Sequence, residues 1–224
     1  MQGHFNVDLF DARGMSDEDF LKLSSELGNR ELFRKIREEH QCDQHTEGKN
    51  LVFDNMAGFI FDHVFRGPAA AWPFNENDGT HSYLNFVNLS ERDNDPTYEE
   101  LYTHGHYAVT GHNVNSSANT SSGSKKFVTE DIMDHEVFTD PDGRESIHYR
   151  SQWLWTPSQG NASDIRSIAI WYSTNGSESM TTTTPEKASA CRIRLKDAGG
   201  TPVEINKTTS QVLLVEYTFK LTSV

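Results

Sequence analysis

The chain has 224 residues, of which 35% are hydrophobic and 11% aromatic, and it carries a formal net charge of −13 at pH 7. This acidic surplus argues against a sequence-independent nucleic-acid binder, which needs Lys and Arg to neutralise phosphates, and against binding to an anionic membrane surface. A membrane-spanning helix needs about 18 consecutive apolar residues, and neither such a run nor a signal-peptide pattern occurs in the sequence.

The first predicted element is a helix that begins after Ser16. Ser16 is a suitable N-cap, three acidic residues follow it in the first turn, and Phe20, Leu23 and Leu27 share one face. Gly28 is expected to end this helix.

A second helix is predicted over "RELFRKIREEH", where Leu32, Phe33 and Ile36 form an apolar stripe. The stripes of both helices are too narrow to bury a core of their own, so the helices must dock on another surface. Because terminal segments often extend across interfaces, we expect that surface to belong to a partner subunit.

A third helix is predicted over "NLVFDNMAGFIFDHVF", because its apolar residues recur at spacings of three and four. The segment "RGPAAAWPF" ends it. We therefore expect a helical segment over residues 1–75 and a β domain over residues 76–224.

The rest of the chain alternates strand patterns with turn-rich segments, and one of these, residues 113–124, offers little to bury. The predicted strands are "HSYLNFVNL", "KKFVTEDIMDHEVF", "SIHYRSQWLWT", "IRSIAIWYS", "ACRIRLKD", "PVEI" and "QVLLVEYTFKLT". Strands with no helices between them predict a mainly β fold, an antiparallel sandwich or jelly roll.

The last strand shows the clearest alternation. Leu213, Val215, Tyr217 and Phe219 occupy one parity and Glu216 lies on the other, which predicts a half-buried strand docked into the sheet. Applying the same alternation to every strand predicts a larger core. That core consists of Phe86, Phe127, Trp153, Trp155, Ile168, Ile170, Ile193, Leu195, Leu213, Val215, Tyr217 and Phe219.

Two histidine-rich stretches invite a metal interpretation. "HQCDQH" contains His40, Cys42 and His45, but a structural zinc site normally has four ligands, and Cys191, the other cysteine, has no ligand-type residue next to it. "HGHYAVTGH" contains His104, His106 and His112, of which the first two share a strand face, but no Glu follows at the required spacing. We therefore expect no metal and no cofactor.

The sequence contains no nucleophile elbow and no phosphate-binding loop, so it predicts no catalytic residues and no enzyme. Trp153 and Trp155 lie two apart in a predicted strand. Such a pair either stacks on a sugar or packs in the core of a sandwich, and we favour the core.

The order of elements resembles small β-rich virion proteins of tailed bacteriophages. The likeness lies mainly in the closing stretch "CRIRLKDAGGTPVEINKTTSQVLLVEYTFKLT", and in the order of a helix near "KNLVFDNMAGFIFDHVF" and a strand such as "IRSIAIWYS". It implies a neck, tail or accessory capsid subunit and brings no catalytic residues with it.

The resulting hypothesis is a non-enzymatic structural protein of the virion, made in the host cytoplasm and assembling with copies of itself and other virion proteins. The alternatives are a capsid decoration protein, a carbohydrate- or receptor-binding module that uses Trp153 and Trp155, and a metal-dependent jelly-roll enzyme that uses His104 and His106.

Overall fold

The computed structural model describes residues 2–52, 83–90, 93–96, 128–139, 141–173 and 187–222. Every strand pair in this part of the chain is antiparallel, so the fold is mainly β with two helices. The elements are β1 (Gln2–Asp11), α1 (Asp17–Leu27), α2 (Asn29–Glu39), β2 (Cys42–Val52), β3 (Tyr83–Ser90), β4 (Val128–Thr139), β5 (Glu145–Trp155), β6 (Ala162–Ile165), β7 (Ser167–Ser173), β8 (Lys187–Arg194), β9 (Ile205–Lys207) and β10 (Gln211–Thr222).

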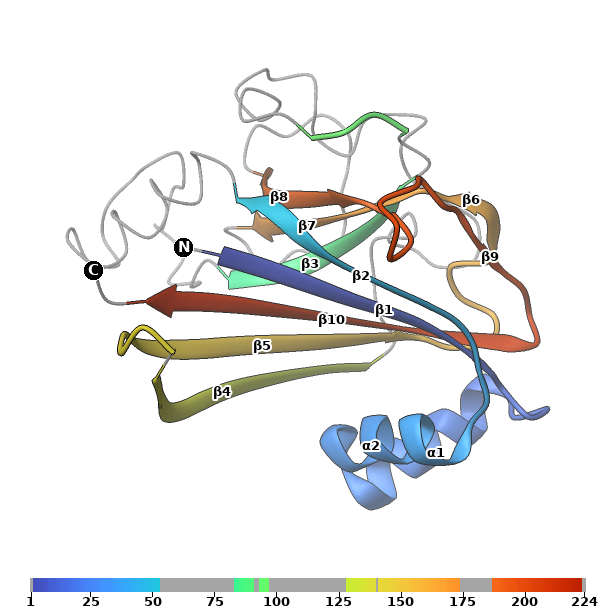
Figure 1. Ribbon diagram of the computed structural model, residues 1–224. Helices are drawn as coiled ribbons and strands as arrows, with labels where there is room; N and C mark the ends of the chain where they lie inside the picture. The colour runs from blue at the N-terminus through green and yellow to red at the C-terminus, as the bar shows by residue number, and fades with distance from the viewer. Residues whose placement is uncertain are drawn as a thin grey trace.

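Eight of the described strands form one sheet in the order β3-β7-β8-β2-β1-β10-β5-β4, and β6 pairs with β9. The strands β2, β1, β10, β5 and β4 follow one another in the sheet, and β3, β7 and β8 lie above β1, β10, β5 and β4 in Figure 1. β2 joins the two groups, because residues 42–50 pair with β1 whereas Leu51 and Val52 pair with β8. At this junction a Cβ atom on Gly48 would lie only 2.5 Å from Cδ1 of Ile193, so the side chain of Ile193 packs against the backbone of β2.

The predicted helical segment over residues 1–75 needs correction at two places. Residues 2–11 form β1, which lies in the middle of the sheet and pairs with β10 on one side and β2 on the other. The predicted third helix is wrong at its start, because residues 50–52 belong to β2. The remainder of that helix and the proposed boundary at residue 75 lie outside the described residues.

The predicted strands overlap β3, β4, β5, β7, β8 and β10, and β10 has the predicted bounds, whereas β6 was not predicted. One small strand is displaced: "PVEI" was expected to be extended, whereas β9 is Ile205–Lys207. The long polar loop predicted over residues 113–124 lies outside the described part of the chain.

The first two helices are confirmed, and their ends follow local chemistry. Ser16 and Asp19 form a capping box at the start of α1. Gly28 lies between the helices with φ of 81°, in the left-handed region that glycine tolerates best. The chain therefore turns directly from α1 into α2.

The helices dock on their own sheet, which corrects the expectation of a partner subunit. Phe20 of α1 and the predicted stripe of α2 are fully buried against one end of β1, β5 and β10. The residues of this cluster are Phe10, Ala12, Phe20, Leu32, Phe33, Ile36, Leu154, Val212 and Leu214. Burial of this apolar area stabilises the helices, which are too short to be stable alone.

The predicted core is confirmed wherever side chains are described. Trp153, Trp155, Ile168, Ile193, Leu195, Leu213, Val215, Tyr217 and Phe219 are all buried. Phe86, Phe127 and Ile170 have side chains outside the described residues. β1 adds Phe5, Val7 and Leu9, which are not among the predicted core residues.

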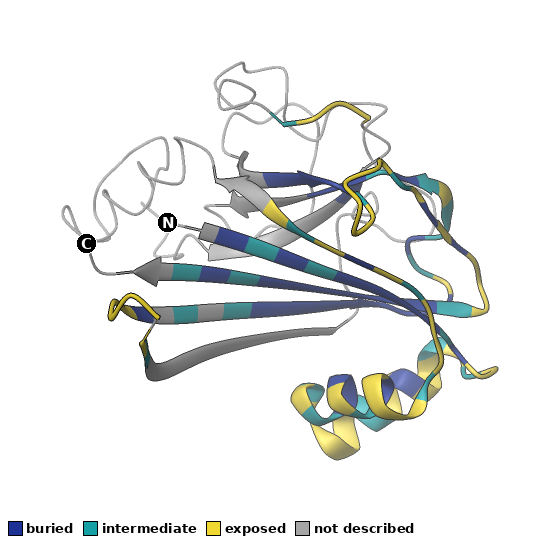
Figure 2. Ribbon diagram, in the orientation of Figure 1, coloured by how far each residue is buried: buried dark blue, intermediate teal, exposed yellow. Residues whose placement is uncertain are grey.

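The face of the long strands that carries this core is the inner face, and the face towards the helices is the outer face. Near the helices both faces are covered, and the strands are buried without interruption; farther along, buried and half-buried residues alternate (Figure 2). β10 is therefore half-buried only over its second half.

Candidate functional site

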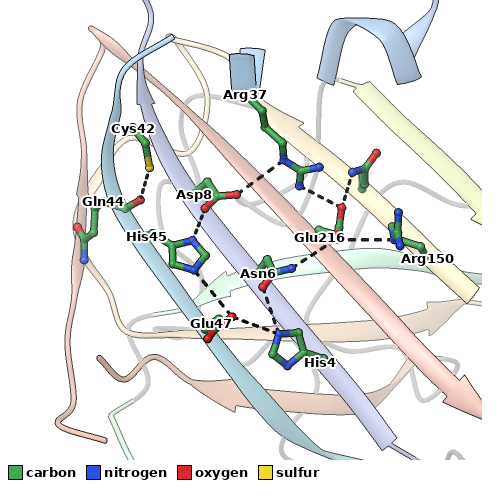
Figure 3. Close-up of polar contacts among 11 residues, drawn as sticks. His4, Asn6, Asp8, Arg37, Cys42, Gln44, His45, Glu47, Arg150 and Glu216 are labelled. Carbon is green, nitrogen blue, oxygen red and sulfur yellow. Dashed lines mark hydrogen bonds and ion pairs between the residues drawn. The ribbon is translucent and has the colours of Figure 1, made fainter. Parts of the chain in front are cut away.

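The outer face beyond the helices carries a row of polar side chains that crosses three strands. Asn6 of β1 lies opposite Glu216 of β10, and Glu216 lies opposite Gln152 of β5. Arg37, from the last turn of α2, reaches the same place (Figure 3). These residues come from distant parts of the chain and meet only in the folded sheet.

Glu216 is the centre of this polar network. Its carboxylate accepts hydrogen bonds from Arg37 (3.0 Å), Gln152 (2.5 Å) and Asn6 (3.3 Å), and Nε of Arg150 lies 3.8 Å away. Burial by itself raises the pKa of Glu216, but the charges of Arg37 and Arg150 and the hydrogen bonds outweigh it, so the net pKa lies below the ordinary value. The group is held as an anion.

A second branch of the network runs along β1 and β2. Nδ1 of His45 lies 2.5 Å from a carboxylate oxygen of Asp8 and donates to it, since the carboxylate can only accept. Nε2 of His45 and Nε2 of His4 lie 3.9 Å and 3.7 Å from one oxygen of Glu47. Nε of Arg37 lies 4.0 Å from Asp8 and links this branch to Glu216 (Figure 3).

A groove of about 420 Å³ lies beside the network, between α2 and β5. Arginines dominate its lining, and they come from both of these elements. It is lined by Arg30, Arg34, Arg37 and Arg150, by Glu31 and Glu38, and by Phe33 and Gln152.

A separate buried cluster lies where α1 meets the segment that follows β5. Nζ of Lys207 donates to the carbonyl oxygen of Thr156 (2.9 Å) and to Oδ1 of Asn161 (2.9 Å). Burial lowers the pKa of Lys207 to about 7, with Asp17 acting in the opposite direction. Asp17 itself accepts a hydrogen bond from the backbone N–H of Ser158 (3.1 Å), so the cluster ties the start of α1 to this segment.

Trp153 and Trp155 are fully buried on the inner face, each with 0% exposure. The preference for a core role is confirmed, and a sugar-stacking role for this pair is wrong, because no ring face is open to a ligand. On the inner face, Trp153 lies opposite Val215 and Trp155 lies opposite Leu213, so both have apolar neighbours on β10.

The structure separates the residues of "HQCDQH". Nδ1 of His40 contacts the backbone oxygen of Asp11 (2.7 Å), His45 pairs with Asp8, and burial raises the pKa of the Cys42 thiol, with the Asp8 charge adding to the effect. Within the described residues, no group of three or more His, Cys, Asp or Glu side chains is arranged to hold a metal ion. The segment containing His104, His106 and His112 lies outside those residues.

The residues of the polar network were not identified from the sequence, although one signal for them was present. In "GHFNVDLFD" the apolar residues Phe5, Val7 and Leu9 alternate with polar ones, which is the pattern of a strand. Glu216 was expected on the solvent side of β10, and no local pattern shows that α2 would bring Arg37 next to it.

Comparisons with protein-family models, with curated protein sequences and with solved structures each give no match. Neither of the described helices has the length and apolar composition that crossing a membrane requires.

Proposed function

We propose that the protein is a non-enzymatic structural subunit of a tailed-bacteriophage particle, assembling as a symmetric oligomer in the neck or tail region. Its strands would form an antiparallel sandwich, with the inner face of β1, β10 and β5 packed against β7 and β8. Its partners would be copies of itself and other virion proteins, with neither nucleic acid nor a membrane bound directly.

The observation that carries a structural role for the polar network is the state of Glu216. A general acid or base works best when its pKa lies near the working pH. The pKa of Glu216 is lowered, and four polar side chains hold the carboxylate in place. Such a satisfied network stiffens a sheet and fixes its register, which suits a structural subunit.

Two features of the strands support the assembly part. The closing stretch that resembles phage virion proteins forms the second half of β8 and all of β9 and β10, and β10 pairs along its length with β1 and β5. Among the described strands, β3 and β4 lie at the two ends of the sheet. End strands offer backbone hydrogen bonds to a neighbouring subunit, which is one route to a symmetric oligomer.

The direct test is the composition of purified phage particles. Mass spectrometry should detect the protein in a constant ratio to the major capsid protein, and a specific antibody should label the neck or tail in electron micrographs. Labelling over the capsid shell would instead indicate a decoration protein. Complete particles that lack the protein would contradict the proposal.

A further inference from the structure

We propose that the groove between α2 and β5 binds a carboxylate-rich peptide segment of a partner protein. Taking that partner to be a neighbouring virion subunit rests on the proposed function, but binding of the acidic segment does not. The argument depends on the side chains that line the groove and on their contrast with the rest of the molecule.

The arginines of the groove are arranged to meet a ligand from two sides. Arg30, Arg34 and Arg37 are spaced by four and three residues, so they share one face of α2. Arg150 extends from β5 into the lining of the same groove. Guanidinium groups bind carboxylates through paired hydrogen bonds, and this arrangement offers several such groups within about 420 Å³.

The four arginines differ in the ion pairs that they already form. Arg37 and Arg150 already form ion pairs with Glu216. Arg34 pairs with Glu31 and Glu38, and these glutamates are 44% and 56% exposed. Glu31 accepts two hydrogen bonds from Arg34 whereas Glu38 accepts one, so an incoming carboxylate can replace the exposed Glu38 at Arg34 with a small loss.

Arg30 is exposed, and it has no hydrogen-bonding or ion-pairing partner in the described part of the chain. It is therefore available to a ligand without the loss of an existing contact.

The charge of the groove is opposite to that of the molecule. Arginines outnumber glutamates four to two in its lining, or four to three when Glu216 beside Arg37 and Arg150 is counted, whereas the whole chain has a net charge of −13. A long polyanion such as a nucleic acid is repelled by the molecule as a whole, but a short acidic peptide feels mainly the nearby guanidinium groups, because salt screens the more distant charges. Charge complementarity thus favours a peptide over a nucleic acid.

The test uses hexaglutamate as the probe, titrated into the purified full-length chain and followed by calorimetry at low and high salt. We expect saturable binding that weakens as salt is added. Arg30→Glu and Arg34→Glu should each weaken binding about tenfold or more, as expected for the loss of a charge-assisted contact. Lys35→Glu, the same charge reversal on the same helix but outside the groove, should leave binding close to that of the wild type.

Three results would overturn the inference: hexaglutamate fails to bind, Lys35→Glu weakens binding as much as the groove variants do, or oligothymidylate binds the groove more tightly than the peptide. Circular dichroism of each variant identifies any that fails to fold, and Arg30→Ala then replaces it. Peptide binding and presence in the particle are measured separately, so either can fail without the other.

Discussion

The two faces of the central strands are built on different principles. On the inner face, two successive rows across β1, β10 and β5 are wholly apolar: Leu9, Leu213 and Trp155, and then Val7, Val215 and Trp153. The neighbouring row on the outer face, one residue along, contains Asn6, Glu216 and Gln152. The inner face therefore supplies most of the hydrophobic stabilisation.

The polar row on the outer face fixes the register of β10 against its neighbouring strands. Because side chains alternate, slipping β10 by one residue would place Glu216 in the apolar core and expose Val215. A buried carboxylate without partners is strongly unfavourable. The polar row therefore adds to the free-energy cost of a misaligned sheet, beyond the cost of exposing apolar residues such as Val215.

The largest expected effect on stability comes from removing β10, whose side chains contribute to both faces of the sheet. A chain that ends at Ser210 lacks β10 and leaves β1 and β5 without their shared partner. It should be insoluble or lack a cooperative thermal transition by circular dichroism, while a chain ending at Thr222 should melt normally. A truncation at Ser210 that melts cooperatively would show that β10 is dispensable.

The next largest effect tests the helix-covered end of the outer face. Leu213 and Leu214 point to opposite faces, yet both are 0% exposed, so replacing either with Ala should lower the free energy of unfolding by about 2–5 kcal/mol. Urea denaturation measures this, with Thr218→Ala as a partly exposed control. A small loss for Leu214→Ala alone would mean that the helices do not cover this face.

The polar part of the outer face is tested by Glu216→Gln. We expect a loss of about 2 kcal/mol at neutral pH, because charge-assisted hydrogen bonds to Arg37 and Gln152 are weakened. The folded-state pKa of Glu216 is lowered from 4.5, so its stabilising contribution is present above pH 4.5 and is lost as the pH falls through the folded value.

Unfolding measured at several pH values should therefore show the difference between wild type and Glu216→Gln shrinking below pH 4.5. Glu47→Gln, at a carboxylate whose side chain is 61% exposed, serves as the control and should have little effect at any pH. A difference between wild type and Glu216→Gln that is independent of pH would indicate a loss of packing rather than of charge.

A second pH effect on stability, at higher pH, is expected from Lys207, which contacts the segment that follows β5. Burial lowers its pKa from 10.5 to about 7, so between these pH values the unfolded chain binds more protons at this group than the folded chain does. Its contribution to the free energy of unfolding therefore rises with pH across that range. Lys207→Met should remove this rise in pH-dependent denaturation; an unchanged slope would contradict the burial of the amine.

The smallest effect concerns the cap of α1. Ser16→Ala should lower the free energy of unfolding by about 1 kcal/mol, because Oγ of Ser16 accepts a hydrogen bond from the backbone N–H of Asp19. Ser25→Ala, at an exposed position within the same helix, is the matched control and should change stability by less. Equal effects of the two substitutions would argue against the capping box.

The sequence was most informative where a local pattern decides the structure. The alternation from Leu213 to Phe219 predicts β10, and Ser16 and Gly28 predict the limits of α1. The inner core follows from the same alternation.

The outer face could not be predicted in this way, because it depends on contacts between distant segments. Glu216 lies 179 residues from Arg37, and nothing near either residue indicates that they meet. The burial of Leu214 likewise depends on where the helices dock. β1 is a different case, since the alternation of Phe5, Val7 and Leu9 is a local pattern that indicates a strand.

Hydrogen exchange in β1 and β10 tests most directly the claim that β1 is a central strand of the sheet, with one apolar and one polar face. If β1 lies in the middle of the sheet, the amides of residues 2–11 that bond to β2 or β10 should exchange as slowly as those of residues 211–222. Rapid exchange over residues 2–11, with protection retained in β10, would show that the N-terminal strand is not part of the sheet and would contradict the arrangement of both faces.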